Sequence, residues 1–361
     1  MNSQMIQAAV SSLKNERFLG GKSVGLFESE FSSFVGSSYS IAVNSGTSAL
    51  IFCLLASNIG KGDMVIVPSA SFVASANSIR AVGATPVFVD INPLDYCIDA
   101  RLLEKTLTES KNSVKAIMPV HLYGRPSNLH AICKLCNEFG ATLIEDACQA
   151  HGAVYQGKKV GTFGDASAFS FYPSKNMTVG GDGGMIVTDK AEVQAICNRL
   201  RDQGRSVKNK YLHDTLGFTA RLNTINAAIG REQLSLLPQW LKKRRTNARR
   251  YNSKLRNVDG IILPPADSDE IISAWHQFVI RTERRDELIT YLSQKGIETG
   301  IHYPIPIHRQ PIYEKEYAKT EAVLPETESW SRQVLSIPVH QNMNSDEVDF
   351  IAESIKQFFE C

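Results

Sequence analysis

The sequence lacks any long hydrophobic run and any large excess of charge of one sign. None of its apolar stretches reaches the roughly 18 residues that a membrane-spanning helix requires. Lys and Arg total 39 against 37 Asp and Glu, a formal net charge of +2, so no nucleic-acid or membrane partner is expected. Residues 1–20 have no continuous apolar core and read as an amphipathic helix, not a signal peptide. We therefore expect a cytoplasmic protein with a small-molecule partner.

Cysteine is also sparse, with seven scattered copies in the chain. An odd number does not indicate a disulfide framework, and Cys133 with Cys136 supplies one pair where a zinc site needs two. These two residues lie three apart on an expected helix, so packing against the core is favoured over metal binding, and no metal site is predicted. Neither Gly-x-Gly-x-x-Gly between a strand and a helix nor Gly-x-x-x-x-Gly-Lys-Ser/Thr is present, which argues against nicotinamide and nucleoside triphosphate sites.

Short apolar runs alternate with helical stretches from about residue 40 onward. The strand-like runs are 40–43, 64–67, 85–89, 114–118 and 142–144. This alternation predicts a mostly parallel sheet covered on both faces, in which ligands bind at the carboxyl ends of the strands. Residues 166–170 and 185–188 then indicate two short strands that form an antiparallel return beside the main sheet.

The remaining pattern indicates a second, smaller unit. A long helical region, 224–257, contains Pro238, and the residues after it include a strand-like run at 277–280 and helical patterns at 285–294 and 345–359. Because the chain is too long for one small core, we predict two domains. Residues 1–240 would form a large α/β/α domain, and residues 241–361 a small α+β domain.

Lys175 occupies a position that suits chemistry better than solvent exposure. It follows the segment SFYPS at 170–174 and precedes the glycine cluster at 180–184, away from any helix face. Pyridoxal 5'-phosphate (PLP) requires an amine that forms a Schiff base with its aldehyde and later moves protons. Burial beside a cationic cofactor would lower the pKa of such a lysine. The alternative is a lysine that extends from a turn into water.

Asp146 is a candidate for the carboxylate that PLP requires against its pyridine nitrogen. It ends the apolar run 142–144, although it is equally suited to cap the segment that follows. Glu145 competes for the role. Successive strand residues point to opposite faces, so only one of the two acids can meet the ring.

Residues 45–50, SGTSAL, are a candidate seat for the phosphate group. A strand breaks at Gly46 and a helix begins with hydroxyl residues, so backbone N–H groups and the helix dipole face an anion. Any helix can be capped in this way, so the motif alone is weak. Ser170 is positioned to add a hydroxyl group to the same phosphate.

Six segments, in order along nearly the whole chain, resemble the DegT/DnrJ/EryC1/StrS family of PLP-dependent sugar aminotransferases. They are SGTSAL at 45–50, SFVASAN at 71–77, PVHLYG at 119–124, EDACQAHGA at 145–153, SFYPSKN at 170–176 and IHYPIPIH at 301–308. The resemblance implies an α/β protein of fold-type I, like aspartate aminotransferase. It also implies a homodimer whose two subunits line each active site.

The resemblance also assigns roles to cofactor-binding residues. It makes Lys175 the Schiff-base lysine, Asp146 the partner of the pyridine nitrogen and Gln149 a hydrogen-bonding partner of the ring oxygen. Phe72 would stack on the ring. The phosphate would be held by backbone and hydroxyl groups of Gly46, Thr47, Ser48 and Ser170.

Three further residues match positions that face the sugar in similar enzymes, namely Tyr172, His302 and Tyr303. For His302 and Tyr303 the alternative is a rigid turn before Pro304. His121 and Tyr123 fit the family pattern as scaffold.

Thr219 departs from the family pattern. Members usually have an asparagine there, which reaches the phosphate from the neighbouring subunit, and here Thr219 keeps only a shorter hydroxyl donor. The loss of one charge-assisted hydrogen bond costs about 1.5 to 3 kcal/mol, enough to weaken cofactor binding without abolishing it. Arg221 and Asn223 are the candidates to compensate.

The resemblance implies an aminotransferase that moves an amino group from an amino acid, expected to be L-glutamate, to the keto carbon of a nucleotide-linked deoxysugar by a ping-pong mechanism. One alternative is a PLP-dependent sugar dehydratase, but such relatives carry histidine in place of the lysine, and Lys175 argues against it. The other is a regulatory homologue without turnover. The residues leave open whether the keto carbon is C3 or C4 and which nucleotide the sugar carries.

Overall fold

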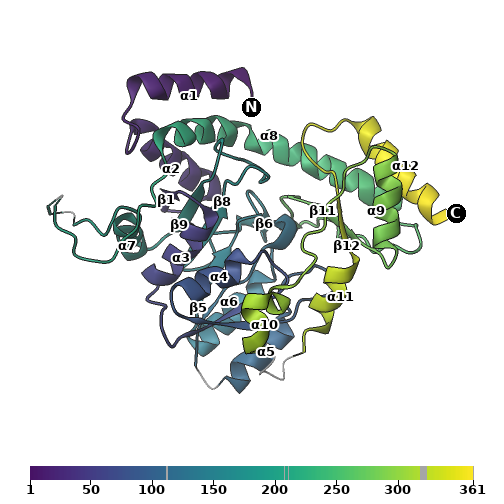
Figure 1. Cartoon of the computed structure of the whole chain (residues 1–361), viewed down its shortest axis with the longest axis horizontal. Helices are drawn as coiled ribbons and strands as arrows, with labels where there is room; N and C mark the ends of the chain where they lie inside the picture. The colour runs from purple at the N-terminus through teal and green to yellow at the C-terminus, as the bar shows by residue number, and fades with distance from the viewer. Residues whose placement is uncertain (111–112, 207, 210, 318–322, 361) are drawn as a thin grey trace.

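A seven-stranded sheet forms the centre of the N-terminal part of the protein (Figure 1). The computed structural model describes residues 1–110, 113–206, 208–209, 211–317 and 323–360. The strand order is β1-β9-β8-β5-β4-β2-β3. The strands are β1 (Tyr39–Val43), β2 (Met64–Pro68), β3 (Thr85–Val89), β4 (Val114–Ile117), β5 (Thr142–Asp146), β8 (Ala166–Ser170) and β9 (Gly184–Thr188).

The pairing confirms the sheet expected from the sequence. Strands β3, β2, β4, β5 and β8 run parallel, whereas β9 is antiparallel to both of its neighbours, β8 and β1. The antiparallel return after residue 165 is therefore present. Because β9 lies between β8 and β1, it brings the turn that carries Lys175 to the same sheet edge as the end of β1.

Both faces of the sheet are covered, which explains why its strands are apolar at nearly every position. In β1, Ile41 and Val43 belong to one hydrophobic cluster and Ala42 to another. The first cluster includes Leu50 of α3 (Gly46–Ala56) and Ile79 of α4 (Ala74–Ala81). The second cluster is packed by α2 (Lys22–Val35) and by the first half of α8 (Thr224–Leu255).

Several helices were not expected from the sequence. The N-terminal segment forms two helices, α1 (Ser3–Asn15) and α2, because Gly20 and Gly21 separate them. The others that the sequence pattern missed are α5 (Ala100–Glu109), α7 (Ala191–Arg201), α10 (Pro311–Tyr317) and α11 (Pro325–Gln333). The expected helix near residue 127 is α6 (Leu129–Phe139), in which Cys136 is buried and Cys133 packs against the same cluster.

The C-terminal part has a core of its own. Strand β11 (Phe278–Arg281) pairs antiparallel with β12 (Val334–Ile337), and α9 (Arg285–Gln294) and α12 (Ser345–Glu360) pack with them. Helix α8 runs into this core and contributes Tyr251 to it (Figure 1). A separate three-stranded sheet consists of β10 (Ile271–Ile272), β6 (Val154–Tyr155) and β7 (Lys158–Lys159). Among the described residues, no helix has both the length and the hydrophobicity needed to cross a bilayer.

Candidate active site

A cavity of about 400 Å³ opens where the central sheet meets a loop of the C-terminal part. Residues just beyond the carboxyl ends of β1, β2, β4, β5 and β8 line it, as the parallel-sheet rule predicts. Its walls include these residues that the sequence singled out: Gly46, Thr47, Phe72, Asp146, Gln149, Ser170, Tyr172, Lys175, His302 and Tyr303. Ser48 and Thr219 are not part of its lining. Six segments far apart in the chain thus meet around one space.

Lys175 lies in the turn between β8 and β9. Its backbone N–H donates to the carbonyl of Tyr172 at 2.8 Å, which closes the turn and directs the lysine to the cavity. Burial lowers the pKa of the Lys175 amine, and the neighbouring groups of Cys148 and Asp146 oppose this shift without reversing it. The amine is therefore easier to deprotonate than a lysine in water, which a nucleophilic amine requires.

Asp146 is the last residue of β5 and faces the cavity with a buried carboxylate. Its Oδ2 accepts a hydrogen bond from the hydroxyl of Ser75 at 2.7 Å, and its Oδ1 accepts from the backbone N–H of Cys148 at 3.2 Å. The Ser75 hydroxyl lies 2.8 Å from that of Ser71. Sequence reasoning missed Ser75 as a functional residue, although it lies inside the segment SFVASAN that carried the family resemblance.

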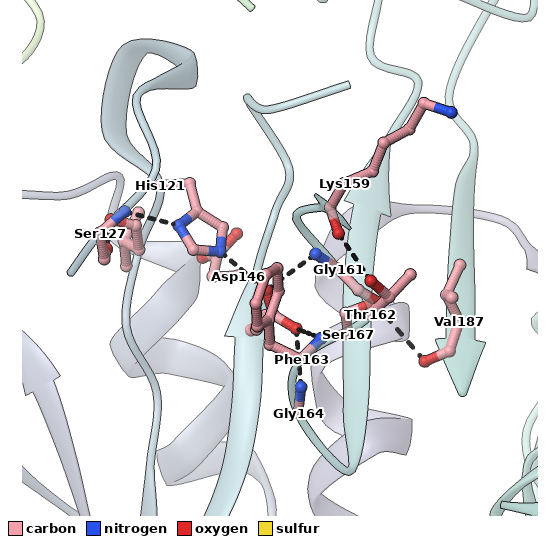
Figure 2. Close-up of polar contacts among 12 residues, drawn as sticks. His121, Ser127, Asp146, Lys159, Gly161, Thr162, Phe163, Gly164, Ser167 and Val187 are labelled. Carbon is pink, nitrogen blue, oxygen red and sulfur yellow. Dashed lines mark hydrogen bonds and ion pairs between the residues drawn. The ribbon is translucent and has the colours of Figure 1, made fainter. Parts of the chain in front are cut away.

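Glu145 points to the opposite face of β5 and holds a different set of partners. Its carboxylate accepts backbone hydrogen bonds from Gly161, Phe163 and Gly164 at 2.7 to 2.8 Å, and Oε2 lies 3.1 Å from Nε2 of His121. Figure 2 shows His121 between Ser127 and the strand that ends at Asp146. The alternation of strand side chains therefore separates the two acids as the sequence predicted.

The hydrogen bonds of the His121 ring select one tautomer. The backbone N–H of Ser127 donates to Nδ1 of His121 at 3.1 Å (Figure 2). Nε2 therefore carries the proton that Glu145 accepts. Burial raises the pKa of Glu145, but the hydrogen bonds from His121, Gly161 and Gly164 outweigh it, and the net shift is downward. His121 and Glu145 thus hold the face of β5 that is turned away from the cavity, in line with the scaffold role expected for His121.

The start of α3 forms one wall of the cavity, where its backbone at Gly46 lies very close to Ser170. The Ser45 side chain caps the helix by accepting from the backbone N–H of Ser48 at 3.1 Å. The Ser48 hydroxyl lies 3.0 Å from that of Ser45, which is why Ser48 turns toward the cap instead of lining the cavity. A Cβ at Gly46 would lie 2.7 Å from Cβ of Ser170, so only glycine fits there. This leaves backbone N–H groups, Thr47 and Ser170 facing one anion-sized space.

The side-chain amide of Gln149 is oriented by a backbone contact. Its Oε1 accepts from the backbone N–H of Tyr123 at 2.8 Å, and its Nε2 lies 3.3 Å from the hydroxyl of Tyr303. The amide nitrogen is therefore the donor on the cavity side. Tyr123 also donates its hydroxyl proton to the carbonyl of His302, in line with the scaffold role expected for it.

Aromatic rings form the mouth of the cavity. Phe72 is 51% exposed and its ring centroid lies 5.6 Å from that of Tyr303, with an interplanar angle of 41°. Tyr172 is 54% exposed on the same cavity. Large aromatic surfaces that remain open to water beside a polar floor provide stacking area for a planar ring or a sugar.

Thr219 lies away from this cavity and is exposed. Its hydroxyl accepts a hydrogen bond from the side-chain amide of Gln203. Arg221 forms an ion pair with Asp202, and Asn223 caps α8 by accepting from the backbone N–H of Asn226 at 2.9 Å. Both residues that were expected to compensate for the missing asparagine are thus engaged in contacts of their own.

The donor set of the cavity fits PLP. A lysine of lowered pKa faces a buried carboxylate, an amide donor lies beside them, and a glycine at the helix start leaves room that any Cβ would fill. These are the groups that an aldehyde, a pyridine nitrogen, a ring oxygen and a phosphate require, respectively.

Comparison with known proteins gives a consistent result across sequence and structure. The family model described as the DegT/DnrJ/EryC1/StrS aminotransferase family matches residues 1–356. The chain is 39% identical over 350 residues to the dTDP-3-amino-3,4,6-trideoxy-alpha-D-glucose transaminase of Streptomyces venezuelae, covering 96% of this chain and 90% of that protein. It is 37% identical over 348 residues to a pleiotropic regulatory protein of Geobacillus stearothermophilus, covering 96% of this chain and 92% of that protein.

Among solved structures, the crystal structure of S. venezuelae DesV in complex with a ketimine intermediate superimposes with a TM-score of 0.94. It is 38% identical in sequence, and the match covers 99% of this chain and 95% of that chain. The similarity therefore extends over both the sheet and the C-terminal part.

Proposed function

The chain belongs to the DegT/DnrJ/EryC1/StrS aminotransferase family, and from this membership we propose that it moves an amino group from L-glutamate to the keto carbon of a nucleotide-linked deoxysugar. It is a PLP-dependent enzyme. The observation that carries the proposal is the pairing of Lys175, with its lowered pKa, and the buried Asp146 in one cavity at the carboxyl edge of the sheet. When bound, PLP supplies an electrophilic aldehyde and an electron-withdrawing ring.

We propose that the residues of the cavity floor hold the cofactor. Asp146, fixed by Ser75, stabilises the protonated pyridine nitrogen, and Gln149 donates its amide N–H to the ring oxygen. The start of α3 with Thr47 and the hydroxyl of Ser170 bind the phosphate. Ser48 acts through the helix cap, since its hydroxyl is directed to Ser45.

Proton movement is assigned to Nζ of Lys175. Its amine accepts a proton when neutral and returns it when charged, and a pKa below that of free lysine makes the neutral form easier to reach. Phe72 covers one ring face, while Tyr172, His302 and Tyr303 face the sugar. Glutamate and the keto sugar use the same cavity in turn, which gives ping-pong kinetics.

We further propose that two copies of the chain form a homodimer. Leu216, Phe218 and Thr219 are exposed on one segment, with Leu216 72% exposed, and an apolar segment of this kind suits contact with a second subunit. Thr219 would then reach the phosphate site of the partner. The division into residues 1–240 and 241–361 remains part of the proposal, as does the cytoplasmic location.

Mixing the purified protein with glutamate tests the proposal directly. We expect the absorbance of bound PLP to fall with glutamate alone and to return when a keto nucleotide sugar is added, with product mass reporting an amino sugar. A Lys175→Ala protein that completes both half-reactions at the wild-type rate would refute the assignment. Loss of water from the sugar instead of amination would favour the dehydratase, and a protein that changes neither substrate would favour the regulatory homologue.

A further inference from the structure

His302 is held by two residues of the C-terminal core that lie outside the cavity. Its Nδ1 lies 2.9 Å from the hydroxyl of Ser336 on β12. The Ser336 hydroxyl in turn donates to Oε1 of Gln277, just before β11, at 2.5 Å. Neither Ser336 nor Gln277 lines the cavity, so the hydrogen bonds form a chain that leads from the β11–β12 pair to the cavity wall.

The hydrogen atoms of this chain can be counted. A hydroxyl group has one proton, and Ser336 gives it to the amide oxygen of Gln277, which only accepts. The Ser336 oxygen can therefore only accept from His302, so Nδ1 of His302 carries a proton. A neutral imidazole has one N–H, which leaves Nε2 with a free lone pair.

The surroundings keep the ring neutral and fix its direction. Burial lowers the pKa of His302, and the nearby Lys175 lowers it further, while His276 is the other titratable ring of this neighbourhood. Gly300 packs against the imidazole so closely that a Cβ there would lie 2.7 Å from Cε1 of His302. The backbone of Gly300 also exchanges two hydrogen bonds with Ser336, at 2.8 and 3.0 Å.

The other ring nitrogen of His302, Nε2, is available to a ligand in the cavity. His302 lines the cavity, and within residues 1–110, 113–206, 208–209, 211–317 and 323–360 its Nε2 has no hydrogen-bond partner. Its neighbours there are Tyr303 and the Lys175 turn. An acceptor nitrogen on the wall of a sugar-sized cavity is suited to bind a hydroxyl proton.

We propose that Gln277 and Ser336 are positioning residues that hold His302 as its Nδ1–H tautomer, so that Nε2 accepts a hydrogen bond from a hydroxyl group of the keto sugar. The inference deepens the proposed function and rests on it for the identity of the ligand. It specifies the substrate class: the sugar presents a hydroxyl donor to His302, and a counterpart that lacks this hydroxyl leaves the Nε2 acceptor of the half-buried His302 without a partner and is disfavoured.

The tautomer is tested without turnover, on the full-length PLP-loaded protein with ¹⁵N-labelled histidine. We expect His302, identified by the loss of its signals in His302→Gln, to show a protonated Nδ1 and an unprotonated Nε2. Ser336→Ala should lose this fixed state, and Ser336→Thr, which restores a hydroxyl, should recover it. Gln277→Glu keeps an acceptor and should preserve it, whereas Gln277→Leu should not. A proton on Nε2 in the wild-type protein would overturn the proposal.

Kinetics provide the second readout. The substrates are two keto nucleotide sugars that differ only at the carbon next to the keto carbon, where one carries a hydroxyl group and the other is deoxy. The wild-type protein should favour the hydroxylated sugar by about tenfold in kcat/KM. Ser336→Ala should raise KM for the hydroxylated sugar and lose most of this preference, and Ser336→Thr should restore it. An unchanged preference in Ser336→Ala would overturn the inference. If the wild-type protein aminates neither sugar and its bound PLP does not react with an amino donor, the result would instead contradict the proposed function.

Discussion

The hydroxyl group of Ser75 donates a hydrogen bond to Oδ2 of Asp146 across 2.7 Å, and both side chains are buried. The two residues come from different elements, the first turn of α4 and the end of β5. The bond leaves Asp146 with a fixed orientation toward the cavity. Ser75 thus supports the cavity from the segment SFVASAN, which is separate from the segment SFYPSKN that contains Lys175.

Replacement of Ser75 by alanine should weaken PLP binding about tenfold, because one hydrogen bond to a buried carboxylate is lost. Titration of the apoprotein with PLP, followed by absorbance, measures the change. Ser78→Ala is a matched control, since Ser78 is equally buried on α4 but donates only to the carbonyl of Ser75, at 2.7 Å. Equal affinities in the two variants would show that the hydroxyl of Ser75 does not support Asp146.

The lowered pKa of Lys175 predicts how reconstitution depends on pH. The neutral amine is the reactive form, and its fraction rises as pH increases through the pKa of Lys175, which lies below the usual 10.5. The rate at which apoprotein reacts with PLP should therefore rise with pH, and the midpoint of this rise should lie below pH 10.5. Stopped-flow absorbance over a pH series measures this profile. A rate that still increases steeply above pH 10.5 would contradict the prediction.

Gly46→Ala should destabilise the protein and close the phosphate end of the cavity. The added methyl group would meet Cβ of Ser170 at 2.7 Å and the sulfur of Cys148 at 3.0 Å, and overpacking of this kind costs about 1 to 3 kcal/mol. Urea denaturation of the apoprotein measures the free energy of unfolding. Gly25→Ala is the control with the opposite sign, since a Cβ within α2 meets nothing within 4 Å and alanine favours a helix by about 0.5 to 1 kcal/mol. A Gly46→Ala protein as stable as wild type would contradict the prediction.

Glu145→Gln should lower the free energy of unfolding by about 3 kcal/mol, because it leaves His121 and three backbone N–H groups without their charged acceptor. The pKa of Glu145 is lowered in the folded state, so its contribution is complete above the unfolded value near 4.5 and is lost as pH falls below it. Wild type should therefore lose stability below pH 4.5 more steeply than the variant. Urea denaturation at a series of pH values measures both effects.

Glu104→Gln provides the comparison for this prediction, because Glu104 is exposed on α5. We expect its unfolding free energy to match that of wild type at every pH. Parallel curves for wild type and Glu145→Gln below pH 4.5 would show that Glu145 takes up its proton equally in the folded and unfolded states, which would contradict a pKa lowered by folding.

Much of the sheet could be predicted from the sequence, because hydrophobic periodicity and short apolar runs are local properties of the chain. The opposite directions of Glu145 and Asp146 follow from the pleat of one strand, and both were assigned correctly to different faces. Helix α2 was missed because its apolar residues, such as Phe27 and Phe31, are explained only by the sheet against which they pack.

Supporting contacts could not be predicted in the same way. Ser75 lies 71 residues from Asp146, and Gln277 lies 59 residues from Ser336. Serine and glutamine at such positions have no local pattern that separates them from surface residues. Only the folded chain shows which distant side chain each of them meets.

Helix α8 joins the two cores as a single helix of 32 residues, with Leu234 packed against the large sheet and Tyr251 against the β11–β12 pair. Any rotation of one core against the other must bend this helix. Pro238 lies between the two contacts and has no N–H to donate, so the helix is mechanically weakest there. The position of the C-terminal core, which holds His302 of the cavity wall through Ser336, relative to the large sheet is consequently tied to the curvature of one helix.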